Sequence, residues 1–230
     1  MIYPSAKLQL IPESATQAHI VPRAIILHSA GGKGSLYGFW LNSSDLECHF
    51  WISETGVVEQ YMSTTTRADA NLHANSFAVS IETESTVTAS EPWTQAQLDA
   101  IIKLCDWLCE THNIPREQIA SPTGSGIGWH VMWGAPGDWT PARGKVCPGP
   151  RRIEQTQQIV IPAVAKMAQP QEQDDWLDMT PAEQKALVDK VNGTALQVDA
   201  IYKAMMDDAK APKGNLFKRL RDSLARIEAA

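Results

Sequence analysis

The sequence has neither a long apolar run nor an excess of basic residues. No stretch of its 230 residues is long and apolar enough to span a bilayer, so we expect no membrane-spanning segment. Acidic residues outnumber basic ones by 26 to 20, which gives a formal net charge of −6. Nucleic-acid-binding domains normally carry a surplus of Lys and Arg, so we expect no nucleic acid partner.

Cysteine is scarce, and the N-terminus lacks the pattern of a secretory signal. Two disulfides would need all four cysteines of the chain, which are Cys48, Cys105, Cys109 and Cys147. Residues 1–5 show no basic segment followed by an apolar one, so we expect no signal peptide and a protein made in the cytoplasm with reduced thiols. A reduced thiol is also the form that a zinc site requires.

The length and composition of the chain indicate one medium-sized α/β domain with a smaller appendage. Apolar residues make up 43% of the chain, enough for a substantial core. We predict a mixed central β-sheet flanked by helices, over residues 1–168. Strands are expected over 23–28, 47–53, 57–61 and 78–83, and helices over 93–112 and 152–167. Residues 121–152 are dense in Gly, Pro and Trp, so we expect a long irregular and functional loop there.

Two local motifs fix details of this domain. Residues 54–56, between two expected strands, read Glu-Thr-Gly and predict a hairpin turn in which Gly56 supplies the backbone freedom. Thr94 and Gln97 have the spacing of a capping box, with Thr94 as the cap and Gln97 reaching back to it. The helix over 93–112 should therefore begin at this pair.

Three residues far apart in the chain lie in contexts that suit metal ligands. His28 ends an apolar run, His130 follows Gly128-Trp129, and Cys147 lies in a segment too rich in Pro and Gly for regular structure. Two imidazoles and a thiolate can form a zinc site with a position left open for water, as in catalytic zinc centres. Each residue alone has a simpler interpretation, as a core histidine, a loop histidine and a buried small residue.

In this order along the chain, the motifs resemble the zinc N-acetylmuramoyl-L-alanine amidases, a superfamily that includes phage endolysins and animal peptidoglycan-recognition proteins. The likeness covers roughly residues 20–160 and includes the strand, Gly turn and strand of 48–60 and the segment 75–82. The resemblance implies a Zn²⁺ ion held by His28, His130 and Cys147. It also implies hydrolysis of the amide bond between N-acetylmuramic acid and L-alanine of bacterial peptidoglycan.

Amide hydrolysis at such a centre needs a base and a group that stabilises the oxyanion. Glu82 is the candidate base, because it ends a strand expected to lie beside the strand of His28. Glu84 lies two residues on and on the same expected face, so it is the alternative. Lys145, two residues before Cys147, is the candidate for the oxyanion. The simpler interpretations are an exposed strand-end glutamate and a solvated loop lysine.

Five further residues are candidates for contacts with the substrate. Tryptophan rings can stack on sugars, and arginine can pair with the carboxylates of a stem peptide. The resemblance places pocket residues near positions 73 and 75. Packing and surface charge are the alternatives for this set, which comprises His73, Asn75, Trp129, Trp133 and Arg143.

The resemblance favours a phage endolysin, which would collect in the host cytoplasm before lysis and then act on the bacterial cell wall. Two alternatives stay open. A cytosolic muropeptide-recycling amidase is one, although such members generally have Asp where this chain has Cys147. A non-catalytic peptidoglycan-binding protein on the same fold is the other, although such members typically lose the cysteine ligand.

The C-terminal part of the chain differs in composition. Residues 169–179 form a polar segment that predicts a linker, and Thr180-Pro181 begins an expected helical region over 180–230. Apolar residues between Val188 and Met205 recur at spacings of four and three, which is typical of a helix that packs on another helix. Homo-oligomerisation, wall binding and a hairpin folded onto the first domain are all compatible with this pattern.

Overall fold

The computed structural model describes residues 1–12, 17–42, 48–134, 138–140, 145–168, 180–182, 184 and 185. The chain separates into two compact units, Met1–Gln169 and Pro170–Ala230. In the second unit the amide of Gln184 donates to the carbonyl of Thr180 over 3.0 Å, where the sequence predicts a first helical turn. The expected linker and the seam between Val188 and Met205 lie outside the described residues.

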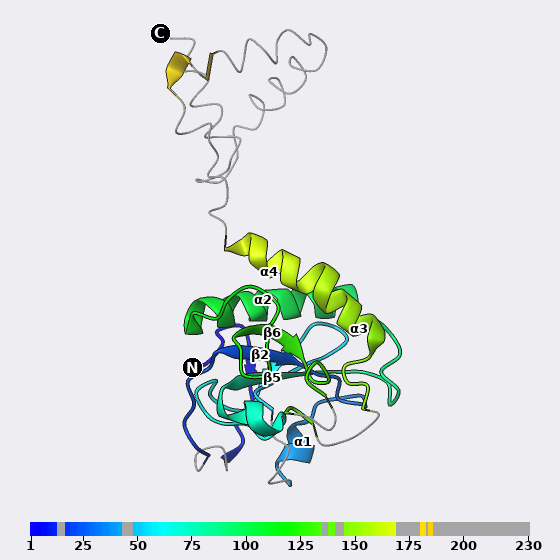
Figure 1. The fold of residues 1–230 in the computed structure, drawn as a ribbon. Coiled ribbons are helices and arrows are strands. Elements are labelled where there is room, and N and C mark those ends of the chain that lie inside the picture. The colour runs from blue at the N-terminus through cyan, green and yellow to red at the C-terminus, as the bar shows by residue number, and fades with distance from the viewer. Residues whose placement is uncertain are drawn as a thin grey trace. The chain divides into compact units, whose positions relative to one another are not determined.

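A mixed six-stranded sheet forms the centre of the first unit (Figure 1). Strands β3 and β4 run antiparallel, and the other neighbouring pairs are parallel. Across the sheet the order is β1 (Lys7–Leu8), β4 (Val58–Gln60), β3 (Phe50–Ile52), β5 (Ala78–Thr83), β2 (Ala24–Leu27) and β6 (Gly126–Trp129). The predicted mixed sheet is confirmed. The register pairs Leu27 with both Ile81 and Trp129, so β2, β5 and β6 end side by side.

Strand β6 corrects the expectation of a wholly irregular segment over 121–152. Two glycines normally weaken a strand, but here each one allows close packing. A Cβ atom at Gly126, where φ is +127°, would come within 2.5 Å of the Glu117 carbonyl oxygen. At Gly128 it would come within 3.0 Å of the Met132 sulfur. The glycines therefore let β6 lie against its neighbours.

Two long helical stretches pack against one face of the sheet (Figure 1). The first is α2 (Gln95–His112), and the second runs through α3 (Pro150–Gln155), the π-helical segment η3 (Thr156–Val160) and α4 (Ile161–Met167). The short helices α1 (Tyr37–Trp40) and η2 (Leu72–Ser76) were not predicted. In the described part of the chain, no helix combines the length and the apolar character that crossing a membrane requires.

Side-chain alternation decides which strand residues meet the helices. Ile25, Leu27 and Ile81 belong to the apolar core that includes α2 and α4. Ile26 belongs to a separate core on the opposite face. His28 continues the alternation of Ile26, so it emerges at the end of β2 on the face that α2 does not cover.

The predicted turn and cap are both confirmed, and they contact each other. Gly56 has a φ of +83° and donates its amide to the Ser53 carbonyl over 2.9 Å, which closes the turn between β3 and β4. The Thr94 hydroxyl accepts the Gln97 amide over 3.1 Å, and the Gln97 side chain accepts the Thr94 amide over 3.2 Å. The same hydroxyl donates to the Glu54 carbonyl over 2.6 Å, so the cap also ties α2 to the hairpin.

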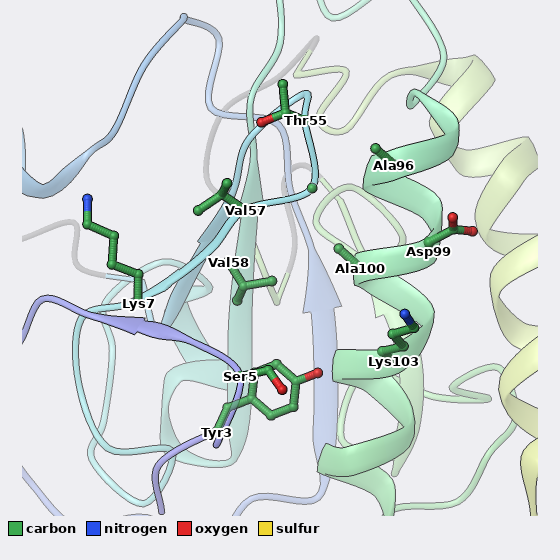
Figure 2. Close-up of a pocket in the computed structure, with 11 residues that line it drawn as sticks. Tyr3, Ser5, Lys7, Thr55, Val57, Val58, Ala96, Asp99, Ala100 and Lys103 are labelled. Carbon is green, nitrogen blue, oxygen red and sulfur yellow. The ribbon is translucent and has the colours of Figure 1, made fainter. Parts of the chain in front are cut away.

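A cavity of about 550 Å³ lies between this hairpin, the N-terminal strand and α2 (Figure 2). Tyr3, Val58 and Ala100 contribute apolar surface to its lining, and Lys7 and Lys103 contribute charge. The lining includes none of the predicted site residues. This cavity is therefore distinct from the candidate metal site.

The side chain of His49 forms hydrogen bonds with main-chain groups in and next to the sheet. The imidazole Nδ1 of His49 accepts the Ser80 amide over 3.0 Å, and its Nε2–H donates to the Thr66 carbonyl over 2.8 Å. The Ser80 amide can only donate and the Thr66 carbonyl can only accept, so the ring must be neutral with its proton on Nε2. Burial lowers the pKa of His49 to about 4. His49 is thus a core residue, as the apolar context of its strand indicates.

The burial of His49 predicts sensitivity to acid. Below about pH 6.5 the unfolded chain protonates this ring while the folded chain does not, until the pH nears 4. The free energy of unfolding should therefore fall by about 3 kcal/mol between pH 7 and pH 4 through this group alone. Urea unfolding of the wild type and of His49→Gln at several pH values measures the effect. The free energy of unfolding of the variant should depend less steeply on pH than that of the wild type. An equal dependence on pH would contradict the assignment of His49 as a buried neutral ring.

Candidate metal centre and active site

The three predicted ligands come together at the ends of β2 and β6. His28 follows β2, His130 follows β6, and Cys147 lies in the segment before α3. The ring centroids of the two histidines are 4.3 Å apart, and Nδ1 of His28 is 3.8 Å from Sγ of Cys147. One ligand atom from each residue lies within 4.8 Å of the others, and all three residues are buried. The cluster could hold one metal ion.

Hydrogen bonds orient both imidazoles in the same way. Nε2 of His28 donates to Oδ1 of Asn71 over 2.7 Å, and Nε2 of His130 donates to the Trp139 carbonyl over 3.1 Å. Each ring therefore carries its proton on Nε2 and has a lone pair on Nδ1. Nδ1 of His130 is buried and has no hydrogen-bond partner among the described residues. A buried lone pair without a partner is costly in a folded protein, and a metal ion would supply what it lacks.

Asn71 is a supporting residue that the sequence analysis missed. Its side-chain amide donates to the Ser80 hydroxyl over 2.5 Å, which turns its oxygen toward His28. Its main-chain amide donates over 2.5 Å to Oδ1 of Asn75, a predicted substrate contact. Asn75 is itself buried, so the structure gives it a place in supporting Asn71. A lone asparagine in a loop carries no sequence signal for such a role.

The Cys147 sulfur accepts the Ser29 amide over 3.2 Å. Burial, together with the nearby Glu82 carboxylate, raises the pKa of the Cys147 thiol to about 12, although hydrogen bonds with Ser29 and the charge of Lys145 act in the opposite direction. The raised pKa means that the thiol keeps its proton in the absence of a metal. A bound cation reverses this preference, because a coordinating thiol loses its proton. The donor set of two neutral imidazoles and a sulfur therefore suits zinc.

Glu82 lies directly beside this cluster. It pairs with Trp51 across the sheet, and Oε1 is 3.5 Å from Nδ1 of His28. Oε2 is buried and has no hydrogen-bond partner within the described part of the chain. Burial raises the pKa of Glu82 to about 7, and the positive charge of Lys145 opposes this shift. A carboxylate with one uncommitted oxygen at this position can exchange a proton with a water in the site.

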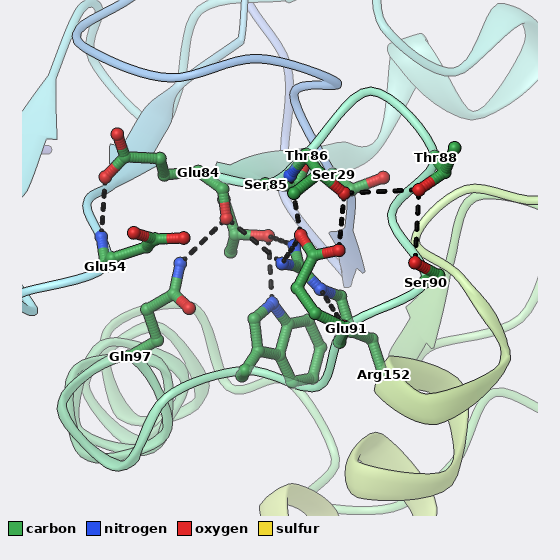
Figure 3. Close-up of polar contacts among 12 residues, drawn as sticks. Ser29, Glu54, Glu84, Ser85, Thr86, Thr88, Ser90, Glu91, Gln97 and Arg152 are labelled. Carbon is green, nitrogen blue, oxygen red and sulfur yellow. Dashed lines mark hydrogen bonds and ion pairs between the residues drawn. The ribbon is translucent and has the colours of Figure 1, made fainter.

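The alternative base, Glu84, faces elsewhere. Its Oε1 accepts the Gly34 amide and its Oε2 accepts the Glu54 amide, each over 2.7 Å. Figure 3 shows the second of these bonds, which holds the hairpin turn. With both oxygens occupied by main-chain amides, Glu84 fastens two loops to the end of β5. The geometry favours Glu82 as the residue that acts in the site.

Lys145 is exposed and acts on the cluster through its charge. The ammonium lowers the pKa of His28, of His130 and of Glu82, so it lies within electrostatic reach of the metal-binding end of the sheet. A cation at this position can stabilise negative charge that develops on a substrate oxygen.

The remaining candidate substrate contacts lie in different surroundings. The His73 side chain is 80% exposed, with Nδ1 3.5 Å from a carboxylate oxygen of Asp138. Trp129 is buried, and Trp133 is half-buried with its ring edge-on to Trp139. Both tryptophans therefore contribute to packing. Arg143 lies outside the described residues.

Comparison with known proteins bears directly on this site. A family model described as N-acetylmuramoyl-L-alanine amidase matches residues 17–150, which contain all three candidate ligands. No curated protein sequence matches the chain.

Several solved structures resemble the chain. A mutant form of PlyL superposes with a TM-score of 0.52 at 14% identity, covering 70% of this chain and 98% of that chain. The amidase LysC from Clostridium intestinale URNW gives 0.47 at 16% identity, covering 70% and 97%. Drosophila peptidoglycan recognition protein SD gives 0.47 at 17% identity, covering 66% and 94%. The likeness to PlyL shows the fold, and the family match covers more than half of the sequence. The chain belongs to the N-acetylmuramoyl-L-alanine amidase family.

Proposed function

We propose that the protein is a zinc-dependent hydrolase that cleaves the amide bond between N-acetylmuramic acid and L-alanine in peptidoglycan. The observation that carries the proposal is the convergence of His28, His130 and Cys147 in a member of the amidase family. Two imidazoles and one thiolate leave a zinc coordination position open for water, as catalytic zinc sites do.

The chain's own residues supply the remaining parts of the reaction. A zinc ion at this site would lower the pKa of a coordinated water and polarise the amide carbonyl. Oε2 of Glu82 can accept the proton of the attacking water and return it to the leaving amine. The Lys145 ammonium can stabilise the oxyanion, and Asn71 and the Trp139 carbonyl keep both imidazoles in the tautomer that binds metal.

Analysis of digested cell wall tests this proposal. The purified protein should expose new N-terminal alanine amines on purified peptidoglycan without releasing reducing sugar ends. A chelator should abolish the activity and added zinc should restore it. Reducing ends without new amines would instead identify a glycosidase. Binding to the wall without either product would identify a non-catalytic peptidoglycan-binding protein.

For the biological role we propose a phage endolysin that acts on the cell wall from the host cytoplasm. The cysteine ligand supports this role over that of a recycling amidase, because the resemblance associates the recycling branch with an aspartate at this position. Turnover on intact sacculi compared with turnover on soluble anhydro-muropeptides separates the two roles. An endolysin should prefer the sacculi, and a preference for the soluble fragments would assign the protein to recycling.

A further inference from the structure

A fully buried arginine lies in the helix that follows Cys147. Arg152 is 0% exposed, and all three of its guanidinium nitrogens donate hydrogen bonds (Figure 3). Nε donates to the Glu91 carbonyl over 3.1 Å, and Nη2 donates to the Glu84 carbonyl over 3.1 Å and to Oε1 of Glu91 over 3.0 Å. Nη1 donates to the Thr83 hydroxyl over 2.9 Å. This last bond connects Arg152 to the candidate metal site, because the Thr83 hydroxyl also bonds to His28.

The Thr83 hydroxyl has a direction fixed by its partners. It accepts from Nη1 of Arg152 and from Nε1 of Trp93, each over 2.9 Å. A hydroxyl has two acceptor lone pairs and one proton, so these two donors use its acceptor capacity. Its proton is left for the His28 carbonyl oxygen, which is 2.6 Å away.

That carbonyl belongs to the peptide unit that joins His28 to Ser29. The N–H of the same unit is the one that Ser29 donates to the Cys147 sulfur over 3.2 Å. Because a peptide unit is planar, holding its carbonyl also orients its N–H. The His28–Ser29 peptide unit is therefore bonded to Thr83 through its carbonyl and to the Cys147 sulfur through its N–H. His28, the residue on one side of this peptide, is itself a candidate ligand. Hydrogen bonds linked in this way polarise one another.

We propose that Thr83, held by Arg152 and Trp93, is a positioning residue for the metal site. It sets the His28–Ser29 peptide so that the His28 ring and the N–H bonded to Cys147 stay in place when metal binds. The inference rests on the proposed function, because it gives these residues a part in holding the metal. The competing view is that Arg152 only fastens α3 to residues 83–91. In that case its loss would lower stability and leave metal binding unchanged.

A matched pair of variants tests the role of the hydroxyl. Thr83→Val keeps the shape of the side chain and removes the hydroxyl, whereas Thr83→Ser keeps the hydroxyl. In zinc-loaded full-length protein, Thr83→Val should weaken zinc affinity by about 10- to 100-fold in a chelator competition, as loss of a residue that supports a ligand typically does. In cobalt-substituted protein its sulfur-to-cobalt absorption band should shift. Thr83→Ser should match the wild type in both measurements.

The arginine is tested in the same way. Arg152→Met should weaken zinc binding in the same direction as Thr83→Val. Arg151→Met, at the exposed neighbouring position, should leave both zinc affinity and the cobalt spectrum unchanged.

The outcomes separate the inference from the proposed function. Wild-type zinc affinity and cobalt spectrum in Thr83→Val, with only the melting temperature lowered, would overturn the positioning role. Absence of zinc and cobalt binding in the wild type would overturn the proposed function itself. Should Thr83→Val not fold, Trp93→Phe removes one of the two donors to the hydroxyl and is judged by the same two measurements.

Discussion

Cys147→Ser should yield a folded protein that retains no stoichiometric zinc. Its turnover on peptidoglycan should fall on the order of 10³-fold or more, because a bound metal contributes several kcal/mol of transition-state stabilisation. The physical reason is the proposed donor set, in which Cys147 offers one of three potential ligand atoms that lie within 4.8 Å of one another. A serine hydroxyl does not replace a thiolate on zinc, and the two imidazoles would be left alone. Elemental analysis after dialysis and an amine-release assay measure the two effects.

Two further variants make this result specific. Cys147→Asp offers a carboxylate, which is also a zinc ligand, so it should keep more zinc than Cys147→Ser. Cys109→Ser makes the same chemical change at a buried thiol of α2 and should keep wild-type zinc content. If Cys147→Ser held a full equivalent of zinc and turned over normally, the sulfur would not be a ligand and the proposed centre would be wrong.

The sequence predicted the three candidate ligands because each has a distinctive local context. His28 ends a buried strand, and the parallel register of β2 with β5 and β6 then brings it beside Glu82 and His130. Such neighbours follow from strand order alone, because the carboxyl ends of adjacent parallel strands meet at one edge. The family resemblance added the order of the motifs along the chain.

The residues that connect to the candidate ligands by hydrogen bonds could not be predicted in this way. Asn71, Thr83 and Arg152 are linked to the site by hydrogen bonds whose partners are set by loop paths and by the docking of α3. The sequence Arg151-Arg152 gives no sign that one guanidinium is exposed and the other is buried. Strand β6 was not predicted, for a related reason. Its glycines resemble loop residues until the close approach of Glu117 and Met132 shows why a side chain would not fit.

The choice between Glu82 and Glu84 also needed the structure. Alternation along a strand places both residues on one face, and this was the limit of the sequence argument. Strand β5 ends at Thr83, so the chain beyond it is free to turn. The Glu84 carboxylate meets the amides of Gly34 and Glu54, and Glu82 alone stays beside His28.

Glu82→Gln should therefore lower kcat by about 10²- to 10⁴-fold, the range typical of a lost general acid–base group, while the zinc content stays unchanged. Glutamine preserves the size of the side chain and its place beside Trp51, but it cannot take a proton from water. Glu82 faces His28 at 3.5 Å without being one of the three clustered ligands, so loss of its charge should spare the metal. Amine release per zinc-loaded molecule measures the effect.

Glu84→Gln is the matched control for this experiment. The same substitution two residues away replaces one acceptor oxygen with an NH₂ group and breaks one of two bonds to main-chain amides. It should lower the melting temperature and leave the turnover of the folded protein near that of the wild type. Unchanged turnover in Glu82→Gln would remove Glu82 from the mechanism. Loss of both zinc and turnover would instead show that Glu82 supports metal binding. Neutralising a residue that acts only as an acid–base group should leave the zinc in place.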